Sequence, residues 1–234
     1  MKPTASSISV EEAYCKHIAL TITPWEVELH GNLRSSLCKR IDRVLDEVQN
    51  DIFYKGNVRS WQNGHTQIFS PGIENDVVFV FSHILEHFFR AGVGYRQICD
   101  WCRLLYKYHS LINLDVVEAR LRKMRLLTEW KSFAYLAVNY LGMPEEMMPF
   151  YSPGGKWKNK ASRINSFVME VGNFGHNRDY SYFSEKTPLV RKLITMRRMM
   201  KDSIRQTAIF PMDAPIFFLR YVKDGISGIF RPQG

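Results

Sequence analysis

An apolar run in the middle of the chain, Val77–Phe81, constrains the fold more than any other feature of the sequence. Taken alone, the run could be a buried strand. The residues that follow, as far as Arg90, contain no glycine or proline that would end a helix, so we interpret the run as part of a buried helix that begins at about Asn75 or Asp76. The short segment Gly92–Gly94 follows, and a second helical pattern covers about Tyr95–His109. We expect these two helices to form the core of the protein.

The N-terminal region has a strand pattern instead. In Pro24–His30 the residues alternate, with Trp25, Val27 and Leu29 on one face and Glu26, Glu28 and His30 on the other. The β-branched and apolar residues 18 to 22 are expected to pair with this strand as a hairpin. Two strands alone are marginally stable in water, so the hairpin would need a larger sheet to join.

The rest of the chain is mainly helical in pattern. Further helices are expected at about 34–50, 115–125, 128–141, 165–171, 187–206 and 215–225, with a turn-rich segment at 55–73 and a loop at 143–160. These patterns predict an α+β fold that is mainly α-helical, with the N-terminal β-hairpin packed on a multi-helix bundle. The expected division is a hairpin region at 1–32 and a helical domain at 33–234.

Composition limits the possible partners. No apolar stretch approaches the roughly 20 residues of a membrane span and no signal peptide is visible, so we expect a cytoplasmic protein without a membrane partner. The formal net charge of +9 favours an anionic partner. The basic residues are spread along the chain, as on solvated helix faces, and we therefore do not expect a nucleic-acid partner.

Two groups of polar residues lie on the central helices. The spacing His83-x-x-Glu86-His87 matches that of a zinc-peptidase motif, but no third metal ligand is evident. The alternative is that the two histidines simply lie on the polar edge of a buried helix. Arg96, Asp100 and Arg103 share one face of the second helix. They are either an ordinary ladder of ion pairs or, because Arg96 follows a glycine turn at a helix start, part of an anion site.

The order of these residues resembles the hallmark of a family of bacterial nucleotidyltransferases. The central string is His83-x3-His87-x4-Gly92-Val93-Gly94-Tyr95-Arg96-Gln97-x2-Asp100-Trp101. Four further stretches are similar to family segments in the same order: Lys16-His17, Glu28-Leu29-His30, Gly172-Asn173-Phe174-Gly175-His176 and Phe210-Pro211. The resemblance extends over nearly all of residues 15–230.

The resemblance implies a set of site residues. In the wider nucleotidyltransferase fold, a Gly-Ser turn precedes an Asp-x-Asp pair, and a third carboxylate on a neighbouring strand completes a Mg²⁺ site that holds the nucleotide phosphates. Glu28 matches the third carboxylate, as catalytic residue and metal ligand, with Glu26 as the fallback; a solvating charge on an edge strand is the alternative for Glu28. The residues expected to bind substrate are His30, His83, His87, Arg96 and Asp100.

This chain departs from the family pattern in one respect, because it contains no Gly-Ser followed by Asp-x-Asp. The resemblance implies transfer of a nucleotidyl group from a nucleoside triphosphate to an unknown acceptor, with Mg²⁺ as cofactor. The departure implies a fragment, a split gene or a decayed relative that is inactive alone. The alternative function is a helical interaction or regulatory module, completed by a separate catalytic chain that supplies the missing strands.

Overall fold

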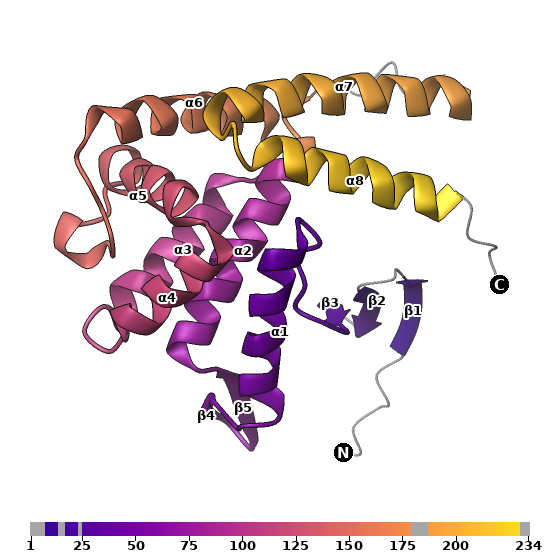
Figure 1. Ribbon diagram of the computed structural model, residues 1–234. Helices are drawn as coiled ribbons and strands as arrows, with labels where there is room; N and C mark the ends of the chain where they lie inside the picture. The colour runs from indigo at the N-terminus through magenta and orange to yellow at the C-terminus, as the bar shows by residue number, and fades with distance from the viewer. Residues whose placement is uncertain (1–7, 14–16, 23–24, 179–186, 230–234) are drawn as a thin grey trace.

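The fold is α+β and mainly helical, as the sequence predicts. The computed structural model describes residues 8–13, 17–22, 25–178 and 187–229. A small N-terminal sheet lies beside helix α1 of a multi-helix bundle (Figure 1). The helices of the bundle are α1 (Lys39–Phe53), α2 (Ile73–Arg90), α3 (Tyr95–Tyr108), α4 (Leu114–Met124), α5 (Leu127–Leu141), α6 (Gly155–Val171), α7 (Pro188–Ile209) and α8 (Ala214–Ile229), with short 3-10 turns η1 (Glu145–Met147) and η2 (Asn173–Gly175).

The N-terminal sheet has three antiparallel strands in the order β1-β2-β3. The predicted hairpin is present as β2 (His17–Ile22) and β3 (Trp25–His30), in a register that pairs His17 with His30. Strand β1 (Ile8–Ala13) was not predicted. Its register with β2 shifts between Val10 and Glu12, which interrupts the alternation of side chains that identifies a strand in a sequence. The third strand supplies the partner that a marginal two-stranded hairpin needs.

Helix α2 runs through the centre of the bundle, and the prediction that Val77–Phe81 is helical is confirmed. The Phe81 ring lies 5.2 Å from the Trp101 ring of α3 and 4.8 Å from the Trp130 ring of α5, and all three side chains are fully buried. Aromatic pairs at these separations add to the free energy of burial. The aromatic contacts therefore lock α2, α3 and α5 together.

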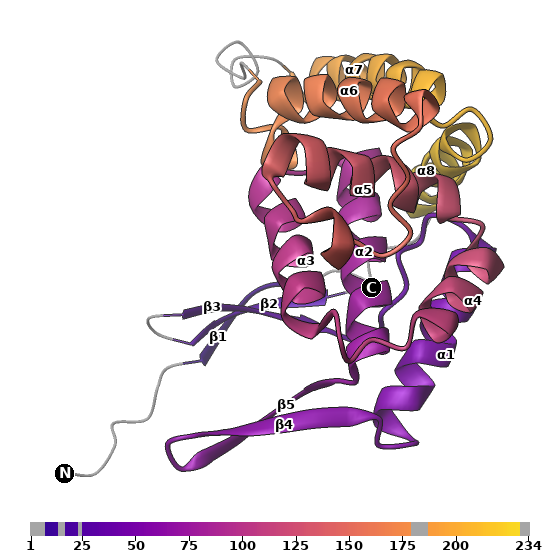
Figure 2. The same ribbon diagram turned by 90° about the vertical axis from the view of Figure 1, so that its left-hand side faces the viewer.

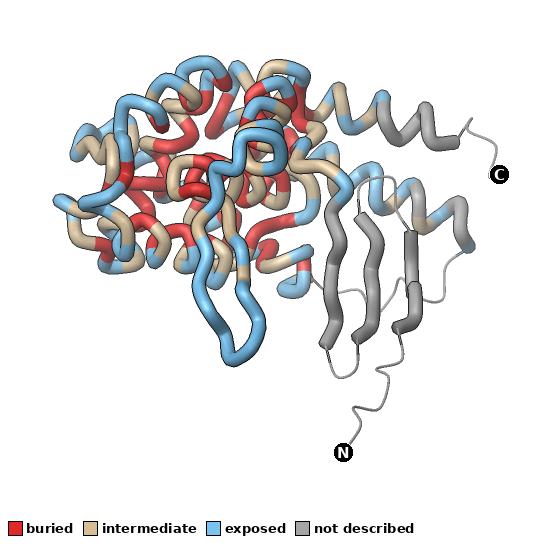
Figure 3. The backbone as a smooth tube through the Cα atoms, turned by 90° about the horizontal axis from the view of Figure 1, so that it is seen from below, coloured by how far each residue is buried: buried red, intermediate tan, exposed pale blue. Residues whose placement is uncertain are grey.

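Two predictions about the loops were wrong. The segment 55–73 contains a second hairpin, formed by β4 (Val58–Asn63) and β5 (Thr66–Pro71), which projects from the bundle as an exposed arm (Figures 2 and 3). Most of its side chains are exposed, so the hydrophobic alternation that reveals a strand is missing. Helix α6 begins at Gly155, within the predicted loop at 143–160, and has 17 residues, whereas a short helix was predicted at 165–171.

In the part of the chain that the structure describes, no helix combines the length and the apolar character needed to cross a lipid bilayer.

A group of charged residues around the buried Glu129 ties the C-terminal helices to the bundle. Arg40 of α1 donates from Nε to the carbonyl oxygen of Met124 at 2.8 Å and forms an ion pair with Asp213, just before α8. Glu129 of α5 is fully buried beside them. Burial, and then the negative charge of Asp213, raise the pKa of the Glu129 carboxyl from its ordinary 4.5 to about 8.

The raised pKa of Glu129 predicts a pH-dependent stability. Between about pH 4.5 and pH 8 the folded protein keeps a proton that the unfolded chain releases, so the free energy of unfolding should fall as pH rises through this window. In Glu129→Gln this fall should be shallower, by up to about 1.4 kcal/mol per pH unit. Urea unfolding at several pH values measures it. The control is Glu146→Gln, at an exposed position; equal slopes in the wild type and both variants would contradict the prediction.

Candidate functional site

Four polar residues of α2 share one face of the helix, and we refer to His83, Glu86, His87 and Arg90 as the polar stripe. Their spacing of three and four residues places them one above the other. Glu86 is buried, and the other three are partly buried. Glu86 bridges the stripe, because its carboxylate lies 3.8 Å from Nδ1 of His83 and 3.5 Å from Nη1 of Arg90. Charged groups held this far from water form a polarised surface on an otherwise apolar helix.

The two histidines of the stripe are in direct contact. Their Nε2 atoms are 2.9 Å apart and the rings meet edge to face with centroids 4.4 Å apart. A hydrogen bond between two imidazole nitrogens needs one donor and one acceptor, so the pair shares a single proton at this position.

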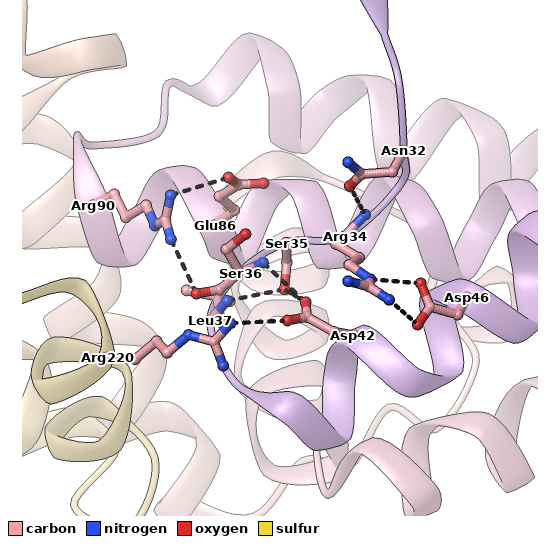
Figure 4. A network of polar contacts seen from close by, with 10 residues as sticks. All are labelled: Asn32, Arg34, Ser35, Ser36, Leu37, Asp42, Asp46, Glu86, Arg90 and Arg220. Atoms are coloured by element: carbon pink, nitrogen blue, oxygen red, sulfur yellow. Dashed lines mark hydrogen bonds and ion pairs between the residues drawn. The ribbon is translucent and has the colours of Figure 1, made fainter. Parts of the chain in front are cut away.

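The loop between β3 and α1, residues 31–38, is fixed to the polar stripe (Figure 4). Arg90 donates from Nη2 to the carbonyl oxygen of Ser36 at 3.0 Å, and the amide of Ser36 donates to Oδ1 of Asp42 at 2.9 Å. Ser36 has a φ of +57°, a left-handed conformation that is unfavourable for a residue with a side chain. The hydrogen bonds on both sides hold the strained residue in place, and strain of this kind often lies at functional sites.

Asp42 connects the loop to the C-terminal helices. Its side chain is buried, accepts a hydrogen bond from the Ser35 hydroxyl at 3.3 Å and lies 3.6 Å from Nη2 of Arg220 on α8. On the outer side of the loop, Arg34 forms a two-pronged ion pair with Asp46, with distances of 2.7 and 2.9 Å. The network therefore joins α1, α2 and α8 around the end of strand β3 (Figure 4).

The two glycine-containing segments singled out in the sequence meet just beyond the C-terminal end of α2. The amide of Phe174 donates to the carbonyl oxygen of Gly92 at 3.2 Å, and the Phe174 ring lies 4.7 Å from the His87 ring. Gly92 has a φ of +102°, and a Cβ there would lie 2.5 Å from the carbonyl oxygen of Gly172. Only glycine permits this approach of two backbones. The contact positions an exposed phenylalanine against the histidine pair.

The structure places the remaining predicted residues in different surroundings. Glu28 and His30 belong to β3, but their side chains lie outside the described part of the structure, as does that of Glu26. Arg96 and Asp100 are exposed on α3, and neither forms an ion pair with any residue that the structure describes, so the predicted ladder with Arg103 is absent there. Asp100 lines a groove between α3 and the β4–β5 hairpin instead of the polar stripe.

The described residues do not form a magnesium site. Among them, no group of three or more His, Cys, Asp or Glu side chains could hold a metal ion. Mg²⁺ prefers several oxygen ligands. The stripe offers one carboxylate, Glu86, which is already engaged by Arg90. The predicted magnesium site therefore depends on Glu28 and on carboxylates other than those described here.

Sequence reasoning missed three residues of this arrangement. Glu86 was considered only as part of the zinc-peptidase motif, and Arg90 and Asp42 were not selected. A signal for the first two was present, because residues 83, 86, 87 and 90 repeat at helical spacing in a segment whose other residues are apolar. Asp42 had no such signal, because its role depends on the conformation of the loop 31–38, which a sequence pattern does not reveal.

Comparison with protein families gives one result. Residues 14–142 match the model of a family described as an uncharacterised nucleotidyltransferase. The matched segment is more than half of the 234-residue chain and includes β2, β3, the polar stripe and α3. Comparisons with curated proteins and with solved structures give no match.

The close approach at Gly92 predicts a position-specific loss of stability. In Gly92→Ala the new Cβ would lie 2.4 Å from Cγ1 of Val171, so the free energy of unfolding should drop by at least about 2 kcal/mol. Gly142→Ala is the matched control, because Gly142 also has a positive φ but has open space around it, and it should cost about 1 kcal/mol. Chemical denaturation measures both. Equal losses would show that the two glycine segments are not in contact.

Proposed function

The chain belongs to the family of uncharacterised nucleotidyltransferases, and we propose that it binds a nucleoside triphosphate and serves the transfer of its nucleotidyl group to an acceptor. The observation that carries this proposal is the polar stripe, which lies within the matched segment and directly contacts the loop that follows β3. A strand with a functional carboxylate and a cationic helix face are the two components that such a reaction requires from a protein.

In this reaction an acceptor oxygen attacks the α-phosphorus, a new P–O bond forms, and the bond to the β-phosphate oxygen breaks as pyrophosphate leaves. The negative charge of the phosphates has to be balanced throughout. We assign part of this role to the histidine pair of the stripe, whose ring N–H groups can donate hydrogen bonds to phosphate oxygens. Arg96, exposed in the first turn of α3, adds a cation at a helix N-terminus, where anions are favoured.

Glu28 is the proposed catalytic carboxylate and ligand of Mg²⁺, with His30 beside it in the strand as a substrate-binding residue. The connection between β3 and the stripe is short: five residues separate His30 from Ser36, whose carbonyl oxygen accepts a hydrogen bond from Arg90. The sequence contains no Gly-Ser followed by Asp-x-Asp. We therefore expect little or no transfer from these 234 residues alone, because one carboxylate holds a hydrated Mg²⁺ poorly.

The alternative function, a helical interaction module completed by a separate catalytic chain, has one structural observation in its favour. In the described part of the sheet, β1 and β3 each pair only with β2, so one edge of each outer strand has no partner strand there. Exposed strand edges accept further strands from partner chains. Release of pyrophosphate that requires both this chain and a second chain carrying the missing acids would support the alternative.

Binding of a nucleoside triphosphate is expected to depend on the histidine pair. His87→Gln removes one imidazole of the pair and its hydrogen bond to a phosphate oxygen, so binding should weaken by about tenfold, the loss expected for one hydrogen bond to a charged group. Isothermal titration with each Mg²⁺–nucleoside triphosphate measures the dissociation constant. His65→Gln, in the exposed turn of the β4–β5 hairpin, is the control. Binding that is unchanged in His87→Gln, or absent from the wild type, would refute the proposal.

A further inference from the structure

A groove lies between the β4–β5 hairpin and the C-terminal half of α3, on a part of the molecule that the proposed function does not use. Its volume is about 940 Å³. The hairpin forms one wall and projects from the bundle (Figures 2 and 3). In the hairpin register Trp61 pairs with Ile68 and Arg59 with Ser70, so these four residues share one face. Arg59, Trp61 and Ser70 of this face line the groove, together with Ser60 from the other face of the hairpin.

Both walls carry aromatic side chains that are open to solvent. Trp61 on the hairpin is 53% exposed, and Tyr106 on α3 is 52% exposed. A third ring, that of Tyr108, is covered by the guanidinium group of Arg59 at 4.4 Å. Arg59 is held there by an ion pair with Asp76 and by a hydrogen bond from Nε to the carbonyl oxygen of Pro71 at 3.0 Å. The groove is therefore a fixed surface with exposed rings on opposite sides.

The groove also carries positive charge that the protein does not balance. Arg103 and Lys107 line it from α3, are exposed, and form no ion pair with any described residue. Asp100 is the one acidic residue among those that line the groove. Asp76, which is not a lining residue, is already paired with Arg59. One guanidinium nitrogen of Arg59, Nη1, is buried without a hydrogen-bond partner. Lys107 lies over the Tyr108 ring, 5.2 Å from its centroid. The groove thus combines two cations that form no ion pair in the described structure with two exposed aromatic rings.

We propose that this groove binds single-stranded nucleic acid, with bases stacked on Trp61 and Tyr106 and phosphates bound by Arg103 and Lys107. Exposed rings alternating with cations are the arrangement by which proteins bind unpaired strands without reading their sequence. A single nucleotide fits less well, because small-molecule sites enclose most of their ligand, whereas both aromatic walls here are half exposed. A duplex fits poorly, since its bases are stacked on each other and cannot stack on the protein.

This proposal differs from the sequence-based expectation of no nucleic-acid partner. That expectation rested on the even spread of basic residues along the chain. The groove gathers Arg103 and Lys107 beside rings from a segment some 40 residues away, an arrangement that only the tertiary fold creates.

Fluorescence anisotropy with a labelled single-stranded oligothymidylate of about 12 nucleotides tests the proposal. Trp61→Ala should weaken binding by about 5- to 100-fold, the range for loss of one stacked base. Phe69→Ala is the matched control, because Phe69 is 61% exposed on the opposite face of the same hairpin, and its variant should bind like the wild type. Arg103→Gln should lower the slope of log K against log salt by about 0.7, the value for one phosphate contact on a single strand.

Lys158→Ala, which removes an exposed cation of α6, is the control for charge and should leave the slope unchanged. Absence of binding at low salt would overturn the proposal. It would also be overturned if a duplex of equal length or thymidine monophosphate bound as tightly as the single strand, or if Trp61→Ala and Phe69→Ala had equal effects. Loss of nucleoside triphosphate binding in His87→Gln would leave this proposal standing, because none of the groove residues belongs to the polar stripe.

Discussion

The packing of three aromatic side chains, Phe81, Trp101 and Trp130, is the interaction on which the rest of the structure depends. It fixes the rotation of α2 against α3 and α5, so that the apolar residues of α2 face these helices. One strip of α2 remains for polar groups. The positions of His83, Glu86, His87 and Arg90 thus follow from the core, since a rotation of α2 by one residue would bury these groups against rings and expose phenylalanine.

Around this core, the polar groups act mainly as connectors between distant segments. Arg90 links α2 to the loop after β3, and Asp42 links the same loop to α8. Ser36 lies between them in a conformation that the loop would not adopt without both contacts. The amide of Gln206 on α7 adds a further link, because it donates to the carbonyl oxygen of Phe88 near the end of α2 at 2.7 Å. The stripe is therefore held rigidly from several directions.

The sequence predicted those parts of the fold that have a strong hydrophobic period. The central helices and the β2–β3 hairpin were of this kind. It failed where the hydrophobic alternation is interrupted or missing: β1 pairs through a bulge, and the β4–β5 hairpin is too exposed to show alternation. At the site, the resemblance supplied His83 and His87, and the helical spacing of Glu86 and Arg90 was a signal that was not used. Asp42 became visible only when the loop conformation was known.

The burial of α5 bears on how this chain divides into units that can fold. The family match ends at Gly142, where α5 ends, but that boundary does not separate two cores. The Phe88 ring packs against Phe167 of α6 at 5.0 Å and near Phe210 after α7 at 6.2 Å, and the buried Glu129 depends on Asp213 for its surroundings. A polypeptide cut at the boundary would present phenylalanine rings and an unshielded carboxylate to water. The recognisable segment is therefore an evolutionary unit, whereas the cooperative unit of folding extends at least as far as α8.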